Sequence, residues 1–305
     1  MKTIRPQHDS DLLSILINLG YSKTKAKQLV KHRAVSIGDQ ETLQPATRLE
    51  QIVRSGEMVS VRSEQEMREE AKTCPGLSIL YEDEAIIVID KPAGLLTIAT
   101  EKEKRKTAFY LLSSYLKEKE KSQQARIFIV HRLDQGTSGL LVFAKNEAVK
   151  QILQEQWEEA EKRYSAVVEG VPHAKTGQIA STLAESKALR VYTVRGNNEE
   201  EKEGKEAKTN YQVVKENGEY ALLDITLITG RKNQIRVHLS DLGHPIVGDK
   251  KYGSKTNPIR RMALHAYSLS FNHPTIPGKR MEFKIEIPGK FHRLFVKKKE
   301  AEKKR

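Results

Sequence analysis

The chain has 305 residues, 38% of them hydrophobic and 30% charged, which suits a globular protein with one large and one small domain. Its single cysteine, Cys74, excludes a disulfide framework and a thiolate metal cluster. The sequence has neither an apolar run of about 18 residues nor a secretory signal pattern, so we expect a cytoplasmic protein. The formal net charge of +13 favours a polyanionic partner such as RNA, although many basic proteins bind none.

Residues 1–62 are predicted to form a small α+β unit. The expected elements are a helix capped by Asp9 or Ser10 and ended by Gly20, a helix from Ser22, and strands at 34–37 and 58–61. Lys23, Lys27 and Lys31 recur every four residues and therefore share one face of the second helix. That face is either an RNA-binding surface or the solvated side of an ordinary helical hairpin.

Residues 77–296 are predicted to form the large domain, after a charged linker at 63–76 that ends in Pro-Gly. The expected strands are a hairpin from Ile79 to Leu96 and the segments 127–130, 139–144, 164–168, 188–194, 209–214 and 220–228. The expected helices are 146–161 and 231–242, the second with Ile235, Leu239 and Leu242 inward. Because no regular βαβ alternation occurs, the predicted fold class is α+β, with a mixed, largely antiparallel sheet and a central cleft.

Two charged segments lie outside these elements. Residues 197–207 are acidic and predict a solvated loop between strands. Residues 297–305 form a basic tail, which is either a frayed end or an additional phosphate contact.

The stretch HRLDQGTSG, residues 131–139, is the most informative part of the chain. An apolar strand ends at Val130, charge appears abruptly, and a Gly-Thr-Ser-Gly turn leads into the next strand. Asp134 therefore lies in a turn at a strand edge, where a rigid base can present its side chain to a cleft. Aspartate and glycine are also ordinary turn formers, so this position alone leaves a structural role open.

This stretch resembles the signature of the RluA-type pseudouridine synthases, HRLD-x-x-TSG. Three further blocks of that family recur in order: EDEAIIVIDKPAGLLT (82–97), KRYSAVVEG (162–170) and LITGRKNQIRVHLSDLGHPIVGDKKYG (227–253), the last followed by MALHA (262–266). The resemblance covers about residues 77–295. The first unit is similar to the RNA-binding domain of the ribosomal protein S-four type, a common companion in this family, although Arg33 stands where that domain usually has glycine.

The resemblance implies a cofactor-free isomerase of uridine in structured RNA. Such an enzyme breaks the bond from uracil nitrogen to ribose, turns the base over and rejoins it through carbon. Asp134 is implied as the catalytic carboxylate, Arg236 as its charged partner, and Tyr164 as the ring that stacks on the uracil. Whether the carboxylate attacks the sugar or base, or removes a sugar proton, stays open.

Further residues are implied to bind the RNA. Arg132 would fill the gap left by the flipped nucleotide or grip its phosphate, and Arg231 and Asn233 join the lysine row in the expected RNA-binding set. Asn233 stands where many members have histidine, which puts in doubt only a role that requires imidazole. We expect large-subunit ribosomal RNA as the substrate, with transfer RNA as the alternative, and a monomer that needs no metal or cofactor.

Two other readings compete with this one. A metal-dependent hydrolase could be built from a set of acidic and histidine residues, namely His131, Asp134, His238, His244, Asp249 and His265. No pair in that set has the His-x-x-x-His spacing of a helical zinc site. A non-catalytic RNA-binding or assembly factor is the second alternative, and the presence of Asp134, Tyr164 and Arg236 argues against it.

Overall fold

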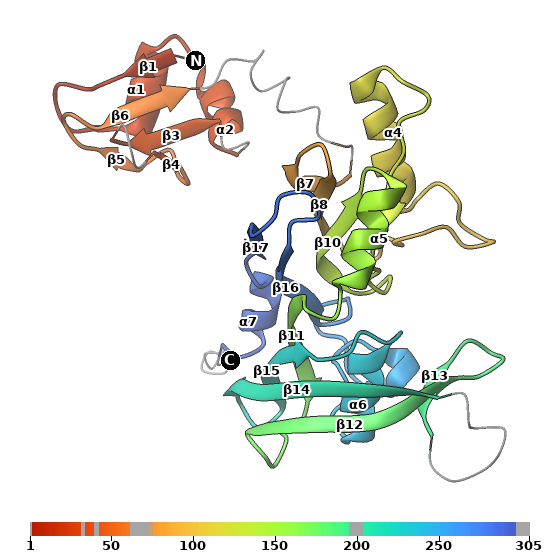
Figure 1. The fold of residues 1–305 in the computed structure, drawn as a ribbon. Coiled ribbons are helices and arrows are strands. Elements are labelled where there is room, and N and C mark those ends of the chain that lie inside the picture. Colours follow the sequence, from red (N-terminus) through yellow and green to blue (C-terminus); the bar gives the residue numbers. More distant parts are fainter. Residues whose placement is uncertain are drawn as a thin grey trace, which may run out of the picture. The chain divides into compact units, whose positions relative to one another are not determined.

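The computed structural model describes residues 2–31, 34–39, 43–61, 74, 76–194 and 204–296. The chain divides into two compact units, Met1–Thr73 and Cys74–Arg305, and each is described by itself (Figure 1). The predicted basic tail and Arg33 lie outside the described residues, and so do most of the predicted linker and acidic loop. Among the described residues, no helix is both long and apolar enough to cross a membrane.

The first unit packs two helices on a small sheet. Helix α1 (Leu12–Asn18) begins one residue later than predicted, because Asp11 rather than Asp9 or Ser10 caps it by accepting a 2.9 Å hydrogen bond from the Ser14 amide. Helix α2 (Lys23–Lys31) begins after Ser22, whose hydroxyl accepts from the Lys25 amide. The sheet has the order β1 (Lys2–Ile4), β6 (Met58–Val61), β3 (Val35–Gly38) and β4 (Gln44–Pro45), and β2 (Ser10–Asp11) pairs with β5 (Ile52–Val53).

The second unit is built on an eleven-stranded sheet. Its path is β13 (Val191–Thr193), β12 (Thr176–Glu185), β14 (Lys205–Glu216), β15 (Tyr220–Leu227), β11 (Glu161–Glu169), β16 (Leu264–Asn272), β10 (Ser138–Ala144), β8 (Ile86–Lys91) and β7 (Ser78–Glu82). Strand β9 (Phe128–Ile129) pairs with β10, and β17 (Arg280–Lys284) pairs with β16. Among the described strands only β10 and β16 run parallel, so the predicted mixed, largely antiparallel sheet is confirmed.

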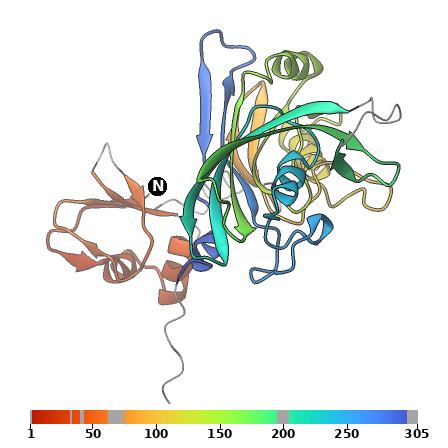
Figure 2. The same cartoon turned by 90° about the horizontal axis from the view of Figure 1, so that it is seen from below.

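Four helices and a single 3-10 turn accompany this sheet in the described part of the chain. They are α4 (Ala108–Glu120), α5 (Glu147–Glu155), α6 (Gln234–Asp241), the turn η2 (Lys250–Tyr252) and α7 (Gly289–Arg293). Helix α6 lies against β12, β13 and β14 (Figure 2). Buried side chains from both layers fill the space between them: Leu183, Val191, Ala207, Val237 and Tyr252. This packing fixes α6 relative to the sheet.

The sequence analysis was wrong or incomplete at several elements. It left residues 98–126 unassigned, although α4 has a Thr107 cap and buries residues at helical spacing, Ala108, Leu112 and Leu116. It missed β12, β16 and β17, and it began β14 four residues too late. Leu242, predicted to face inward, follows the end of α6 and is 38% exposed, so only Ile235 and Leu239 of that predicted set are buried.

A glycine sets the spacing of the two parallel strands at the centre of the sheet. Gly139 has a φ of +118°, and a Cβ atom there would lie 2.1 Å from the carbonyl oxygen of Ala266 on β16. Only glycine therefore allows β10 and β16 to approach so closely at this point. Because the turn that carries Asp134 leads directly into β10, this contact anchors the turn on the centre of the sheet.

Candidate active site

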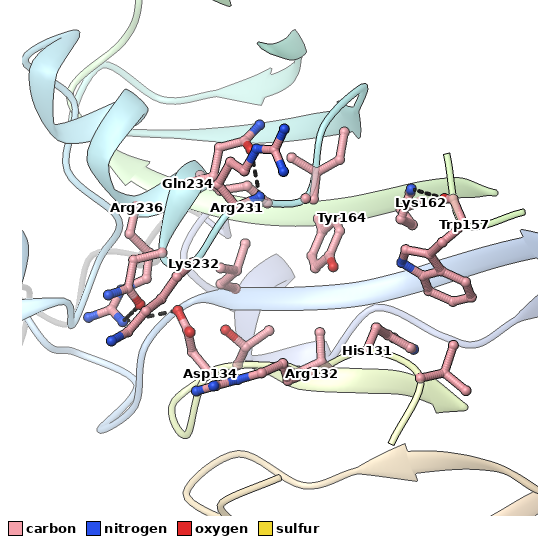
Figure 3. A pocket seen from close by; sticks show the side chains of 18 residues that line it. His131, Arg132, Asp134, Trp157, Lys162, Tyr164, Arg231, Lys232, Gln234 and Arg236 are labelled. Atoms are coloured by element: carbon pink, nitrogen blue, oxygen red, sulfur yellow. Dashed lines mark hydrogen bonds and ion pairs between the residues drawn. The ribbon is translucent and has the colours of Figure 1, made fainter. Parts of the chain in front are cut away.

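A cleft of about 330 Å³ opens over β11 and lies within the size range of ligand sites. Most of its lining comes from the turn before β10, strand β11, and the turn and first residues of α6, and Trp157, Leu227 and Leu264 complete it. In Figure 3, Asp134, Arg132 and Arg236 lie at one end and Lys162, Trp157 and His131 at the other, with Tyr164 between them. The cleft thus joins segments from three of the four sequence blocks.

The remaining block, which ends in Lys91-Pro-Ala-Gly, braces the Asp134 turn from behind. On one side of Asp134, the Thr97 hydroxyl donates to the Leu133 carbonyl at 2.7 Å and accepts from the Leu133 amide at 3.2 Å. On the other side, the amide of Gly94 donates to the Gln135 carbonyl at 2.7 Å. The residues on both sides of Asp134 are therefore fixed by one loop, a role that the sequence did not reveal.

Lys91 closes that loop on itself. Its side chain is fully buried, and its ammonium group donates to the carbonyl of Leu95 at 2.8 Å and to that of Pro92 at 3.1 Å. Burial lowers the pKa of Lys91 to about 8, and the negative charge of Asp134 opposes the shift. Lys91 therefore shapes the brace and adds positive potential behind the carboxylate.

Asp134 and Arg236, which the resemblance pairs, meet in the structure. Arg236 Nη1 donates to Asp134 Oδ2 at 3.0 Å, and the Asp134 side chain is 24% exposed in the cleft. The other carboxylate oxygen, Oδ1, has no hydrogen bond to a described residue. One oxygen is held and the other is available to a ligand.

Arg236 is itself held by a second carboxylate, that of Asp249. Arg236 Nε donates to Asp249 Oδ2 at 2.6 Å and Nη2 donates to Oδ1 at 2.8 Å, a two-pronged contact with a buried side chain. The ring of Tyr252 lies against the guanidinium, 4.7 Å from its carbon. Although burial works against it, the hydrogen bonds and charge of Asp249 raise the pKa of Arg236, so the guanidinium stays charged.

Asn233 supports the same arginine. Its φ of +54° is a left-handed conformation that asparagine tolerates better than most residues, and it delays the start of α6 to Gln234. Its Oδ1 accepts from Arg236 Nη1 at 2.8 Å and its Nδ2 donates to the Tyr252 hydroxyl at 3.1 Å. Both polar ends of this buried amide are used within the protein, so the structure shows Asn233 as a support of Arg236. Its predicted contact with RNA stays a prediction.

Tyr164 points from β11 into the middle of the cleft and is 8% exposed. Burial, with the nearby charge of Asp134, raises the pKa of its hydroxyl. The phenol therefore stays protonated at neutral pH, so it presents an aromatic ring and an O–H donor rather than a base.

The predicted RNA-binding cations differ in how they are engaged. Arg132 is exposed and has no partner among the described residues, whereas Arg231, also exposed, donates to the Glu206 carbonyl at 3.1 Å. In the first unit, Lys23 and Lys27 are exposed on α2, and the side chain of Lys31 lies outside the described part. Arg132 is therefore free to meet a ligand at the mouth of the cleft.

The histidines of the competing hydrolase have partners within the protein. Val142 N donates to His131 Nε2 at 3.1 Å, and burial, with the charge of Lys162, lowers the pKa of His131 to about 3. The partners of the others are Ser181 and Thr209 for His238, the Glu169 carbonyl for His244, and Ser138 for His265. Within the described ranges, no group of three or more His, Cys, Asp or Glu side chains is placed to hold a metal ion.

Comparisons with known proteins point in one direction. The RNA pseudouridylate synthase family profile matches residues 85–241. An uncharacterised RNA pseudouridine synthase of Aquifex aeolicus is 35% identical over 292 residues, covering 90% of this chain and 89% of that protein. Ribosomal large subunit pseudouridine synthase D of Neisseria meningitidis serogroup B is 33% identical over 301 residues, covering 92% of this chain and 76% of that protein.

Among solved structures, human RNA pseudouridylate synthase domain containing 4 superposes with a TM-score of 0.59 at 24% identity. The match covers 75% of this chain and 95% of that one. At this identity the likeness concerns the fold.

Proposed function

Because the chain belongs to the RNA pseudouridine synthase family of isomerases, we propose that it converts uridine to pseudouridine in large-subunit ribosomal RNA, with Asp134 as the catalytic carboxylate. The observation that carries this proposal is the arrangement of Asp134. Arg236 fixes one oxygen, the other makes no hydrogen bond to a described residue, and the ring of Tyr164 points into the same cleft.

The arrangement supports the chemistry in a specific way. A carboxylate that attacks the sugar or base, or removes a sugar proton, must begin ionised and correctly aimed. Arg236 provides the countercharge, and its two-pronged bond to Asp249 fixes its orientation so that Nη1 meets Asp134. The free oxygen of Asp134 then reaches the substrate without a rearrangement of the site.

Tyr164 and Arg132 bind the flipped nucleotide and the RNA around it. A uracil ring that must leave the sugar, rotate and rejoin needs a flat surface rather than a fixed set of hydrogen bonds, and the buried ring of Tyr164 offers one. Arg132 is exposed at the cleft and bonds to none of the described residues, so it can replace the extracted nucleotide or bind its phosphate.

The large ribosomal subunit is proposed as the source of the RNA because the Neisseria relative bears that substrate in its name. We propose that the first unit is an RNA-binding domain of the S-four type. The exposure of Lys23 and Lys27 along one face of α2 supports it.

The test uses the purified full chain and two substrates, an unmodified transcript of large-subunit ribosomal RNA and a pool of unmodified transfer RNA transcripts. Pseudouridines are then mapped by carbodiimide blocking. We expect conversion at defined uridines of the ribosomal transcript, with full activity in a strong chelator. Conversion confined to transfer RNA would reject the proposed target, and conversion of neither RNA would reject the activity.

A further inference from the structure

We propose that the end of the cleft formed by Lys162 and Trp157 binds a phosphodiester group of the RNA strand that carries the target uridine. The inference rests on the proposed function and assigns a second contact site to the same cleft. It starts from two donors at this end that have no acidic partner among the described residues.

Lys162 is a buried cation that faces the cleft. It precedes Tyr164 by two residues on β11, so both side chains project from the same face of the strand. Lys162 is only 6% exposed, and its ammonium group makes one hydrogen bond, to the Trp157 carbonyl at 2.9 Å. Two of its three N–H donors therefore make no hydrogen bond to the part of the chain that the structure describes.

No carboxylate of the described residues forms an ion pair with Lys162. The acid that acts on it is Glu158, an exposed residue in the turn after α5, and it acts through space rather than by contact. His131, the titratable group beside this end, is neutral because burial and the charge of Lys162 lower its pKa. A buried charge without a countercharge is unfavourable, and an anionic ligand would remove that cost.

Trp157 adds a second donor in a fixed position. Its indole ring packs against the His131 ring with ring centres 4.5 Å apart and the planes tilted by 31°, and Lys162 Nζ lies 5.5 Å from the indole centre. The indole N–H bonds to none of the described residues, and Figure 3 shows the nitrogen edge turned toward Tyr164. The two donors therefore converge on one end of the cleft.

This pair of donors suits a phosphodiester better than a base. A compact ammonium group acts as a point charge and is a common phosphate ligand, and the neutral indole N–H can serve a second oxygen of the same group. Two residues along a strand separate Lys162 from Tyr164 by roughly 7 Å. If Tyr164 stacks on the target uracil, the phosphates within reach of Lys162 are those that flank the target nucleotide.

The test is a double-mutant cycle between Lys162→Met and one neutral linkage in the RNA. The substrate is a short hairpin with a uridine that the wild-type protein converts, made in versions with a single methylphosphonate on either side of it. We expect Lys162→Met to lower kcat/KM about tenfold on the normal hairpin. We also expect one methylphosphonate to lower the wild-type value similarly, and the combination to be no worse than either change alone.

Companion variants separate ligand binding from support of the fold. Lys162→Arg keeps the charge and should retain most activity, and Trp157→Phe keeps the ring while losing the N–H, so a severalfold loss is expected. Lys175→Met is the matched control, because Lys175 is exposed, pairs with Glu216 and does not line the cleft. It should leave kcat/KM and its response to methylphosphonate unchanged.

Additive losses in the cycle would overturn the inference and reduce Lys162 to a support of the Trp157 turn. If Lys162→Met fails to fold, the test rests on Lys162→Arg and on the wild-type protein assayed with the two methylphosphonate hairpins. A wild-type protein whose kcat/KM is insensitive to both neutral linkages would then overturn the inference. A wild-type protein that converts no uridine would instead contradict the proposed function, so the two failures are distinguishable.

Discussion

The two ends of the cleft differ in whether their charged side chains are paired with an opposite charge. At the Asp134 end, the arginine contacts two carboxylates, and the residues on both sides of Asp134 are braced by Thr97 and Gly94. At the Lys162 end, the buried ammonium group has no carboxylate partner among the described residues. The charges at the Asp134 end are therefore paired without a ligand, as expected of a preorganised catalytic site, whereas we expect an anionic ligand to pair the charge at the Lys162 end.

The two carboxylates on Arg236 show a similar contrast. Asp249 has a side chain only 2% exposed and takes two hydrogen bonds, whereas Asp134 has a side chain 24% exposed and takes one. Asp249 therefore fixes the orientation of Arg236, and Arg236 in turn fixes one oxygen of the partly exposed Asp134. This order gives Asp134 a fixed position while one of its oxygens stays open to the substrate.

Asp134→Asn should have the largest effect. The amide is nearly isosteric and removes only the ionisable group, so we expect at least a hundredfold loss of single-turnover rate with RNA affinity within severalfold. Turnover above a hundredth of wild type would remove Asp134 from the nucleophile or base role.

Arg236→Met should cost tens of fold in rate at neutral pH, because a charge-assisted hydrogen bond to the carboxylate is lost. RNA affinity should stay within severalfold of wild type, because Arg236 contacts Asp134 and Asp249 and is held inside the protein. Arg236→Lys should be milder, though a point charge cannot reproduce the two-pronged contact. A Met variant with the wild-type single-turnover rate but weakened RNA affinity would argue that Arg236 binds RNA instead.

Asp249→Asn should lower the single-turnover rate about tenfold, since the two-pronged contact with a charged acceptor is lost and Arg236 can rotate away from Asp134. Loss of a buried ion-pair partner should also lower the melting temperature. RNA affinity should stay close to wild type. A variant that loses affinity but keeps its rate would contradict a positioning role.

Neutralising Lys23, Lys27 and Lys31 together should act on binding alone. Each lost phosphate contact flattens the plot of log affinity against log salt by roughly 0.7 to 0.9. The rate at saturating RNA should hardly move. An unchanged salt slope would show that the row is a solvated helix face.

Asp83→Asn should leave the cleft chemistry untouched, lower the stability above pH 3.8 and remove the part of the acid loss of stability that Asp83 causes. Although burial works against it, hydrogen bonds from His273 and Tyr81 lower the pKa of Asp83 to about 2 from 3.8. The resulting stabilisation is present above pH 3.8 and is lost as pH falls toward 2. After allowance for solvent screening it is worth about 1 kcal/mol. Unfolding midpoints against pH measure it, and a variant with the wild-type acid limb would contradict the assignment.

Sequence patterns predicted the local features of the site better than its supports. Charge following an apolar strand marked the Asp134 turn, and periodicity located β6, β10 and the core of α6. The contacts of Thr97 with Leu133 and of Arg236 with Asp249 join residues far apart in the chain, which periodicity cannot show. Asn233 was misplaced because a helical pattern does not reveal a left-handed residue before the helix begins.

The position of Lys162 in the cleft could have been predicted from the sequence. It lies two residues before the predicted strand 164–168, and a strand that begins at Glu161, as β11 does, places Lys162 and Tyr164 on one face. Its lack of a carboxylate partner could not, since that depends on every segment packed around it. Helix α4 was missed despite a clear cap and a buried stripe, and only its packing under the sheet explains why those apolar residues are there.

The most direct test of the central claim compares pseudouridine maps of total RNA from three strains: one lacking the gene, one with the wild-type gene restored, and one with Asp134→Asn restored. The account predicts that defined pseudouridines of large-subunit ribosomal RNA disappear on deletion, return with the wild-type gene and stay absent with the variant. Identical maps in all three strains, or restoration by Asp134→Asn, would contradict it.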